Sequence, residues 1–209
     1  MGKDSRRAGK VLYGNNLPDL YINYLIRGGS LRYNGLVRGG GRAKGRSVEG
    51  NRILVIDDEA AKQAHLPGIA SGETIATLAF TEENGRWDEE GITATASGSG
   101  DSWTIDGTKM YVLDGHTASL LLVAARTGAG VSLFAVDAGA SGITRTALAT
   151  MDQTRKQAKV EFSGTPARLI GTDGGGWTVL SRVLDLAAVA LAAEQVGGAQ
   201  LCLEMAVQY

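Results

Sequence analysis

The chain has 209 residues, of which 44% are hydrophobic and 21% charged, and this suits one large or two small globular domains with a sizeable core. Its net charge is −1, its one cysteine (Cys202) excludes an internal disulfide, and its two histidines are too few for a Cys/His metal cluster, so we expect no metal site. We find neither an apolar stretch near the roughly 20 residues that span a bilayer nor the apolar core of a signal peptide, and therefore expect a cytoplasmic protein without a membrane span.

Residues 1–52 differ in composition from the rest of the chain. They hold 11 Lys/Arg against 3 Asp/Glu and 11 of the 30 glycines, whereas residues 53–209 hold 10 Lys/Arg against 19 Asp/Glu. Stretches such as "RGGGRAKGR" (38–46) show no apolar periodicity, so we expect this arm to be mostly disordered. Such an arm can bind phosphate backbones, be a solvated tail, or be a segment that does not belong to the following domain. The abrupt change near residue 53 favours the last, and we do not expect nucleic acid as the partner.

Residues 53–73, "ILVIDDEAAKQAHLPGIASGE", predict a short helix. Asp57, Asp58 and Glu59 place acids where a first helical turn favours them. Pro67 is predicted to end the helix.

Short segments rich in β-branched and aromatic residues follow, separated by Gly, Asp and Asn at spacings near 10 residues, and they predict an all-β barrel or sandwich. The Asp106-Gly107 pair is predicted to form a tight hairpin turn. The predicted strands are 74–80, 92–98, 102–113, 119–126, 130–138, 143–149 and 158–170.

From about Trp177 to the end, Ala, Leu, Glu and Gln occur at helical density and predict one long helix. Its apolar positions surround most of the circumference, as in a helix buried among others. We therefore expect a further domain or an oligomer to cover it.

The ordered series "LAFTEENGRWD", "WTIDGTKMYVLDG", "LLLVAAR", "KVEFSGTPARLIG" and "AAEQVGGAQLCLEMAVQY" resembles the acyl-CoA dehydrogenases from about residue 57 to 209. The resemblance implies an α+β fold: an antiparallel β-barrel-like middle domain, a short preceding helix, and a long C-terminal helix from an incomplete helical bundle. The implied divisions are the arm (1–52), the end of an N-terminal helical domain (53–73), the middle β-domain (74–172) and the first, truncated helix of a C-terminal domain (173–209).

The resemblance implies FAD as cofactor and assigns four residues to its binding. In this family the Thr-Glu turn lies against the flavin, so Phe80 and Thr81 inherit that role. Tyr111 matches an aromatic residue that packs on one flavin face. Leu113 matches a threonine that hydrogen-bonds the reactive nitrogen, a bond that leucine cannot make. Without the resemblance, Tyr111 and Leu113 would be interpreted as core strand positions.

The same turn departs from the family pattern, because Arg86-Trp87 stands where Gly-Ser usually precedes Asp88. We assign Arg86 and Trp87 to substrate binding: the guanidinium can hold a phosphate and the indole can stack on a ring or wall the acyl pocket. The alternative is a surface cation–π pair.

The resemblance supplies no catalytic residue. The base is usually a glutamate late in the C-terminal domain, and where family members place it on the first helix of that domain, this chain has Ala187. Glu194 and Glu204 are interpreted as structural carboxylates. We therefore expect flavin-dependent α,β-dehydrogenation of an acyl-CoA thioester by a chain that is incomplete or inactive alone.

The family further implies an electron-transferring flavoprotein as oxidant and a homo- or hetero-oligomer. The alternative function is a noncatalytic β-domain or binding module whose basic arm contacts a partner or nucleic acid. A yellow purified protein would distinguish the first hypothesis from the second.

Overall fold

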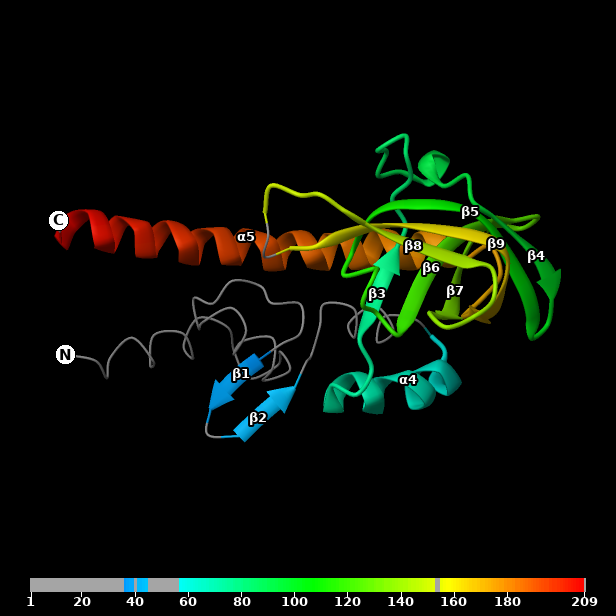
Figure 1. The fold of residues 1–209 in the computed structure, drawn as a ribbon, viewed down its shortest axis with the longest axis horizontal. Helices are drawn as coiled ribbons and strands as arrows, with labels where there is room; N and C mark the ends of the chain where they lie inside the picture. The colour runs from blue at the N-terminus through cyan, green and yellow to red at the C-terminus, as the bar shows by residue number, and fades with distance from the viewer. Residues whose placement is uncertain (1–35, 40, 45–56, 153–154, 209) are drawn as a thin grey trace.

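The computed structural model describes residues 36–39, 41–44, 57–152 and 155–208 (Figure 1). Strand β1 (Leu36–Gly39) pairs antiparallel with β2 (Gly41–Lys44). The rest of the arm lies outside the described residues, so its expected disorder stays a prediction.

Helix α4 (Glu59–Ser71) begins as its sequence predicts and ends later than predicted. Asp58 is the N-cap, and its Oδ1 accepts a 2.8 Å hydrogen bond from the Ala61 N–H. The prediction that Pro67 ends the helix is wrong, because Pro67 lies inside it. The helix ends at Gly72, whose φ of 77° is left-handed. Burial of Ile69 (3% exposed) holds the last turn on the core, which offsets the hydrogen bond that proline removes.

All the strands predicted after residue 73 are present, with bounds close to those expected. A short 3-10 helix, η1 (Glu89–Gly91), precedes the second of them. The strands are β3 (Ala76–Ala79), β4 (Thr95–Ser99), β5 (Ser102–Leu113), β6 (Leu120–Thr127), β7 (Gly130–Asp137), β8 (Ile143–Leu148) and β9 (Gln157–Ile170).

These strands form a barrel-like sheet. The hydrogen-bonded order is β3-β6-β4-β5-β9-β7, the additional β6–β7 pairing closes the barrel, and β8 pairs with β9. The pairs are antiparallel except that β3 and β4 each run parallel to β6. The predicted α+β fold with an antiparallel barrel-like middle domain is thus confirmed, with those two parallel pairings as a detail the sequence did not indicate.

The predicted hairpin turn at Asp106-Gly107 is wrong, because both residues lie inside β5. The β4–β5 hairpin turns instead at Gly100, within the pair Ser99↔Ser102. Opposite Asp106, strand β9 has one extra residue, since Ile105 pairs with Thr165 and Gly107 with Phe162. The Asp106 carboxylate accepts a 2.7 Å hydrogen bond from the Gly164 N–H in that bulge.

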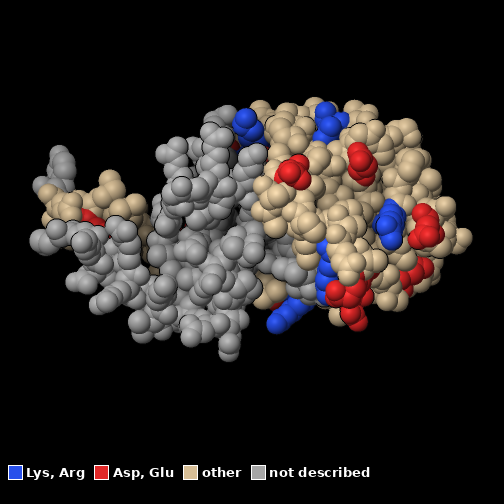
Figure 2. All heavy atoms as spheres, turned by 90° about the horizontal axis from the view of Figure 1, so that it is seen from below, with Lys and Arg blue, Asp and Glu red and all other residues tan. Residues whose placement is uncertain are grey.

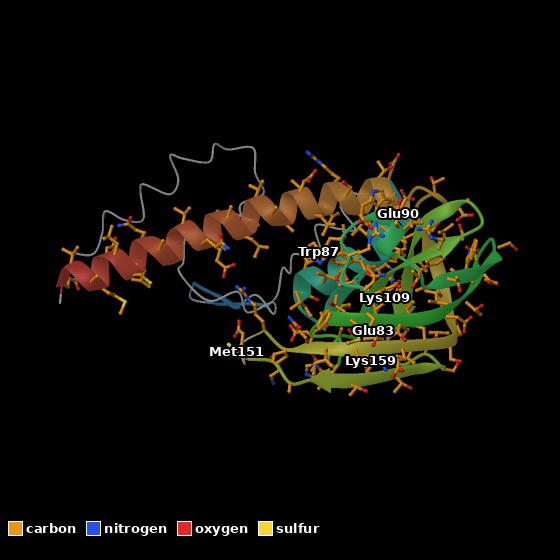
Figure 3. All side chains as sticks on the ribbon, turned by 90° about the horizontal axis from the view of Figure 1, so that it is seen from above. Glu83, Trp87, Glu90, Lys109, Met151 and Lys159 are labelled. Atoms are coloured by element: carbon orange, nitrogen blue, oxygen red, sulfur yellow. The ribbon has the colours of Figure 1, made fainter. Side chains whose placement is uncertain are left out.

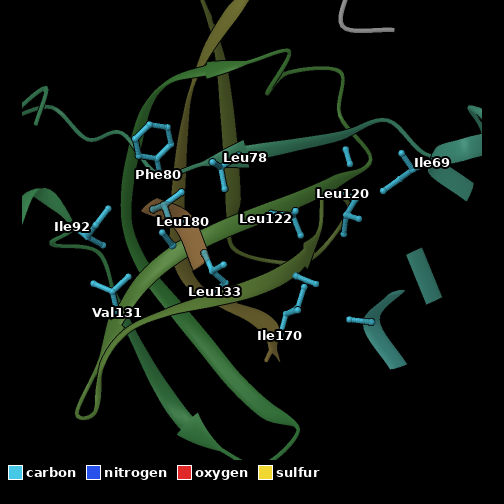
Figure 4. Close-up of a cluster of buried hydrophobic side chains, with 14 residues drawn as sticks. Ile69, Leu78, Phe80, Ile92, Leu120, Leu122, Val131, Leu133, Ile170 and Leu180 are labelled. Carbon is cyan, nitrogen blue, oxygen red and sulfur yellow. The ribbon is translucent and has the colours of Figure 1, made fainter. Parts of the chain in front are cut away.

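The described part of the chain has two hydrophobic clusters on opposite sides of the barrel wall. One contains alternate residues of β6 and β7, such as Leu121 and Phe134, together with β4, β5 and β9 residues, and fills the barrel. The other contains the intervening residues, such as Leu122 and Leu133, and includes Leu180 of the last helix (Figure 4). Burial of both faces explains why β6 and β7 are continuous apolar runs.

Helix α5 (Gly176–Gln208) confirms the predicted long helix and extends away from the barrel (Figure 1). Only its first turns are buried, at Gly176, Leu180 and Val183. The expectation of no stretch suited to a bilayer needs correction: α5 is long and apolar enough to cross a membrane, by length and composition alone. Its exposed apolar residues include Val189, Leu191, Val196, Leu201, Leu203, Met205 and Val207.

Candidate functional site

Two segments that are about 30 residues apart in the sequence meet where β3 ends beside the second half of β5. The Met110 N–H donates to the Thr81 carbonyl at 2.8 Å. Thr77 Oγ1 donates to the Leu113 carbonyl at 2.5 Å. The structure therefore brings the Phe80–Thr81 turn next to the segment that carries Tyr111 and Leu113.

Tyr111 stands in an unusual backbone conformation. Lys109 pairs with Val160 and Val112 with Ala158, so Met110 and Tyr111 together oppose a single residue of β9. In this bulge Tyr111 has a φ of 57°, in the left-handed region that non-glycine residues seldom adopt. Its side chain is 50% exposed in spite of being aromatic. Strained residues of this kind are concentrated at functional sites.

The other residues predicted on this wall are less exposed. Phe80 and Thr81 are each 9% exposed, and Leu113 is half-buried. The Leu113 carbonyl is already occupied by the Thr77 hydroxyl. Tyr111 therefore offers the largest accessible surface of the four predicted flavin-side residues.

The loop between Glu82 and Thr93 carries Arg86 and Trp87. The Arg86 guanidinium donates to the Asp88 carboxylate at 2.8 Å and to Glu90 at 2.6 Å. Hydrogen bonding to Asp88 and then to Glu90 raises the pKa of Arg86, so the side chain stays cationic but paired. The Arg86 side chain is 47% exposed, and both pairs are therefore weak.

Trp87 packs edge-on against Phe80, with ring centroids 5.1 Å apart and planes at 85°. The indole nevertheless remains 64% exposed. Figure 3 shows Trp87 and Glu90 with Lys109 in this part of the molecule. The structure thus places Trp87 in direct contact with Phe80, one of the predicted flavin-side residues.

A buried ion pair lies under the loop, and the sequence patterns did not single it out. Lys109 Nζ lies 2.6 Å from Glu82 Oε1, with the two side chains 0% and 6% exposed. Burial lowers the pKa of Lys109 to about 8, against the opposing effect of Glu82. Burial alone would raise the pKa of Glu82, but its bonds to Lys109, Thr93 and Ala94 bring it below the ordinary value. The available signal was the two-residue alternation of Trp103, Ile105 and Gly107, which places Lys109 on the inward face of β5.

Two carboxylates of α5 have structural partners. Glu194 accepts a 2.6 Å hydrogen bond from Arg155, which lies just before β9. Glu204 is exposed and accepts from Gln200 at 3.0 Å. The Ala187 position, between them and the barrel, carries no titratable group.

The part of the chain that carries these residues is similar to known proteins. The profile of the acyl-CoA dehydrogenase middle domain matches residues 77–165, from β3 into β9. The chain is similar to the acyl-CoA dehydrogenase family. An acyl-CoA dehydrogenase of Bacillus subtilis (strain 168) is 27% identical over 173 residues, which cover 78% of this chain and 46% of the relative.

Two solved structures are similar to this chain. The acyl-CoA dehydrogenase of Geobacillus kaustophilus is 27% identical with a TM-score of 0.71, over 76% of this chain and 45% of that one. An FAD-dependent dehydrogenase is 26% identical with a TM-score of 0.72, over 78% and 46% of the two chains. This chain therefore spans less than half the length of these relatives.

The residues of this chain fit one side of a flavin. Tyr111 presents an exposed ring, and the Thr81 turn lies beside it, held by the Met110 contact. The fit is weaker at Leu113, which has no side-chain donor, and at Arg86, whose donors are directed at Asp88 and Glu90. An aromatic face with neighbouring backbone and hydroxyl groups suits an isoalloxazine ring.

Proposed function

We propose that this chain forms the flavin-side wall of an acyl-CoA dehydrogenase, acting on an acyl-CoA thioester. The observation that carries the proposal is the contact between the Thr81 carbonyl and the Met110 N–H, which joins the two flavin-side segments of the family. FAD, when bound, accepts the hydride that leaves the β carbon of the thioester. An electron-transferring flavoprotein as oxidant and an oligomeric assembly are part of this proposal, and the cytoplasmic location stays a prediction.

The residues of this chain are assigned to binding and orientation. Tyr111 packs on one face of the ring, and Phe80 and Thr81 border its edge. Trp87 walls the acyl side of the site, continuing the surface of Phe80. Fixed groups of this kind accelerate a reaction by holding the reactants in a productive geometry.

The proton at the α carbon needs a base, and the carboxylates of the last part of α5 are engaged elsewhere. Ala187 occupies the first-helix position, while Glu194 is paired with Arg155 and Glu204 is bound by Gln200. A positioned base contributes roughly 10²–10⁴-fold to such a step. We therefore propose that this chain takes up FAD but does not reduce it with acyl-CoA by itself.

FAD binding to the full chain tests the proposal, with fluorescence as the readout. Replacing Tyr111 by Ala removes the stacking surface and should weaken binding by about threefold to tenfold, the value of one aromatic contact. Met151→Ala is the matched control, because Met151 is fully exposed and lies outside the proposed site (Figure 3). A chain that binds no FAD, or binds it equally well without the Tyr111 ring, refutes the proposal.

Anaerobic mixing with acyl-CoA thioesters tests the missing base separately. We expect the flavin absorbance of the reconstituted protein to stay unchanged. Rapid bleaching would show that the chain has a base, and Glu194→Gln and Glu204→Gln would then identify it.

The alternative function, a binding module for nucleic acid or a protein, was assigned to the basic arm, most of which lies outside the described residues, so it stays a prediction. On the barrel face shown in Figure 2, Lys/Arg and Asp/Glu side chains are interspersed rather than gathered by sign. A phosphate-backbone site requires a basic stripe. A colourless protein that binds nucleic acid would favour this alternative.

A further inference from the structure

The Glu82 carboxylate joins both ends of the loop that carries Arg86 and Trp87. Glu82 itself precedes the loop, and its Oε1 accepts from the Ala94 N–H at 2.9 Å, beyond the loop's other end. The Thr93 N–H lies 3.0 Å from each carboxylate oxygen, and the Thr93 hydroxyl donates to Oε2. One side chain therefore closes the base of the loop.

Lys109 attaches this closed base to β5. Its Nζ donates to Glu82 Oε1 at 2.6 Å and lies 3.5 Å from the Phe80 carbonyl. Lys109 is also the last residue before the bulge at Met110 and Tyr111. The side chain of Lys109 therefore contacts the Phe80–Thr81 turn, and its backbone leads directly into the bulge that presents Tyr111.

Arg126 of β6 supports the far part of the loop. Its guanidinium donates to the Glu89 carbonyl at 2.7 Å and to the Ile92 carbonyl at 3.1 Å. Its backbone N–H donates to the Ala94 carbonyl at 2.8 Å. The loop is thus held by directional polar contacts, while its tip at Trp87 stays exposed.

A gain in the free energy of unfolding does not explain why a buried ion pair of this kind is present. Desolvation of two charges offsets much of their attraction, and apolar replacements of similar volume are often as stable. A satisfied polar cluster does, however, permit only one arrangement of the segments that it joins. The contribution of the cluster is therefore to geometry.

We propose that Glu82 and Lys109 are positioning residues, which hold the Trp87 loop and the Tyr111 bulge in register as one surface. Loss of either charge releases the loop from the barrel without unfolding the barrel. The effect on FAD rests on the proposed function, whereas the effect on the loop does not.

The test uses Glu82→Gln and Lys109→Met in the full chain, with trypsin cleavage after Arg86 as the cofactor-free readout. The matched controls are Glu161→Gln and Lys159→Met. Those two residues form a 2.8 Å ion pair on β9 with side chains 42% and 36% exposed, and Lys159 is labelled in Figure 3. We expect cleavage after Arg86 to rise about tenfold in the Glu82 and Lys109 variants, since cleavage reports the open population of a segment. Cleavage after Lys62 in α4 and both control variants should stay at the wild-type rate.

FAD affinity is the second readout, and Thr93→Val is the milder variant. It keeps both charges and removes only the hydroxyl bond to Glu82, so cleavage after Arg86 should rise less, by about threefold. If the charge variants lose their barrel, the Thr93 variant decides the question. Wild-type cleavage after Arg86 in Thr93→Val, or in folded Glu82→Gln and Lys109→Met, overturns the proposal. If the variants are cleaved faster but the wild-type chain binds no FAD, the loop positioning is upheld and the proposed function is rejected.

Discussion

Gly107→Ala should destabilise the barrel strongly, because Gly107 lies inside a strand rather than at a hairpin tip. Its φ is 139°, a backbone region that is nearly restricted to glycine. An added Cβ would lie 2.6 Å from the Ala94 Cβ and 2.8 Å from the Ala94 Cα. Backbone strain of about 1–3 kcal/mol and overpacking of about 1–3 kcal/mol together predict a loss of roughly 2–6 kcal/mol.

Gly100→Ala is the matched control, since Gly100 stands in the true β4–β5 turn. Its φ is 57°, and an added Cβ meets nothing within 4 Å. That substitution should cost only about 1–2 kcal/mol, the penalty for a left-handed alanine. Urea unfolding followed by tryptophan fluorescence, to which buried Trp103 contributes, and by circular dichroism measures both values. If the two variants lose equal stability, the assignment of Gly107 to a crowded strand interior is refuted.

The remaining predictions concern Lys109, Asp58 and Pro67. The pKa of Lys109 is lowered by burial from 10.5 to about 8, so the unfolded chain binds more protons between these values and stability should rise with pH across them. The rise attributable to this side chain is about 3 kcal/mol, and urea unfolding of wild type and Lys109→Met at pH 8, 9 and 10 measures it as the difference in slope. Asp58→Ala should lose about 1–2 kcal/mol at pH 7, because Asp58 caps α4 and also accepts from the Gly171 N–H at 3.0 Å. The Ala61 and Gly171 hydrogen bonds lower the pKa of Asp58, so the difference should disappear as pH falls below the ordinary value of 3.8, and equal losses at pH 3 and 7 would contradict it. Pro67→Ala should raise the thermal midpoint by restoring a helical donor, with a gain of at most about 2 kcal/mol because alanine also frees the unfolded chain.

The strands were predictable because their signals are local. β-branched and apolar residues gather between Gly, Asp and Asn turns, and these patterns gave the bounds of β5 without error. Asp106-Gly107 was misassigned because the same dipeptide suits a turn and a strand that faces a bulge. The choice is made by Gly164, which lies 58 positions away from Asp106 and forms its hydrogen bond only after β9 has paired.

The site was partly predictable, and the limit was again set by long-range contacts. The resemblance selected Phe80, Thr81 and Tyr111, and the structure brings their segments together through the Thr81–Met110 bond. Lysine side chains are seldom fully buried, so the sequence alone does not indicate that Lys109 lies in the interior. Its burial depends on Glu82, 27 positions earlier, and neither residue indicates the other by local spacing.

Arg86 and Trp87 differ in how ready each is to meet a ligand. The guanidinium is engaged by Asp88 and Glu90, but exposed ion pairs of this kind contribute only about 0–1 kcal/mol, so a phosphate can displace them at little cost. Trp87 needs no such exchange, since its indole is already exposed and supported at its edge by Phe80. Salt weakens an arginine–phosphate contact and leaves an apolar indole contact largely unchanged. If Arg86 and Trp87 bind substrate as proposed, the salt dependence of that binding separates the contribution of Arg86 from that of Trp87, even though the two residues are neighbours in one loop.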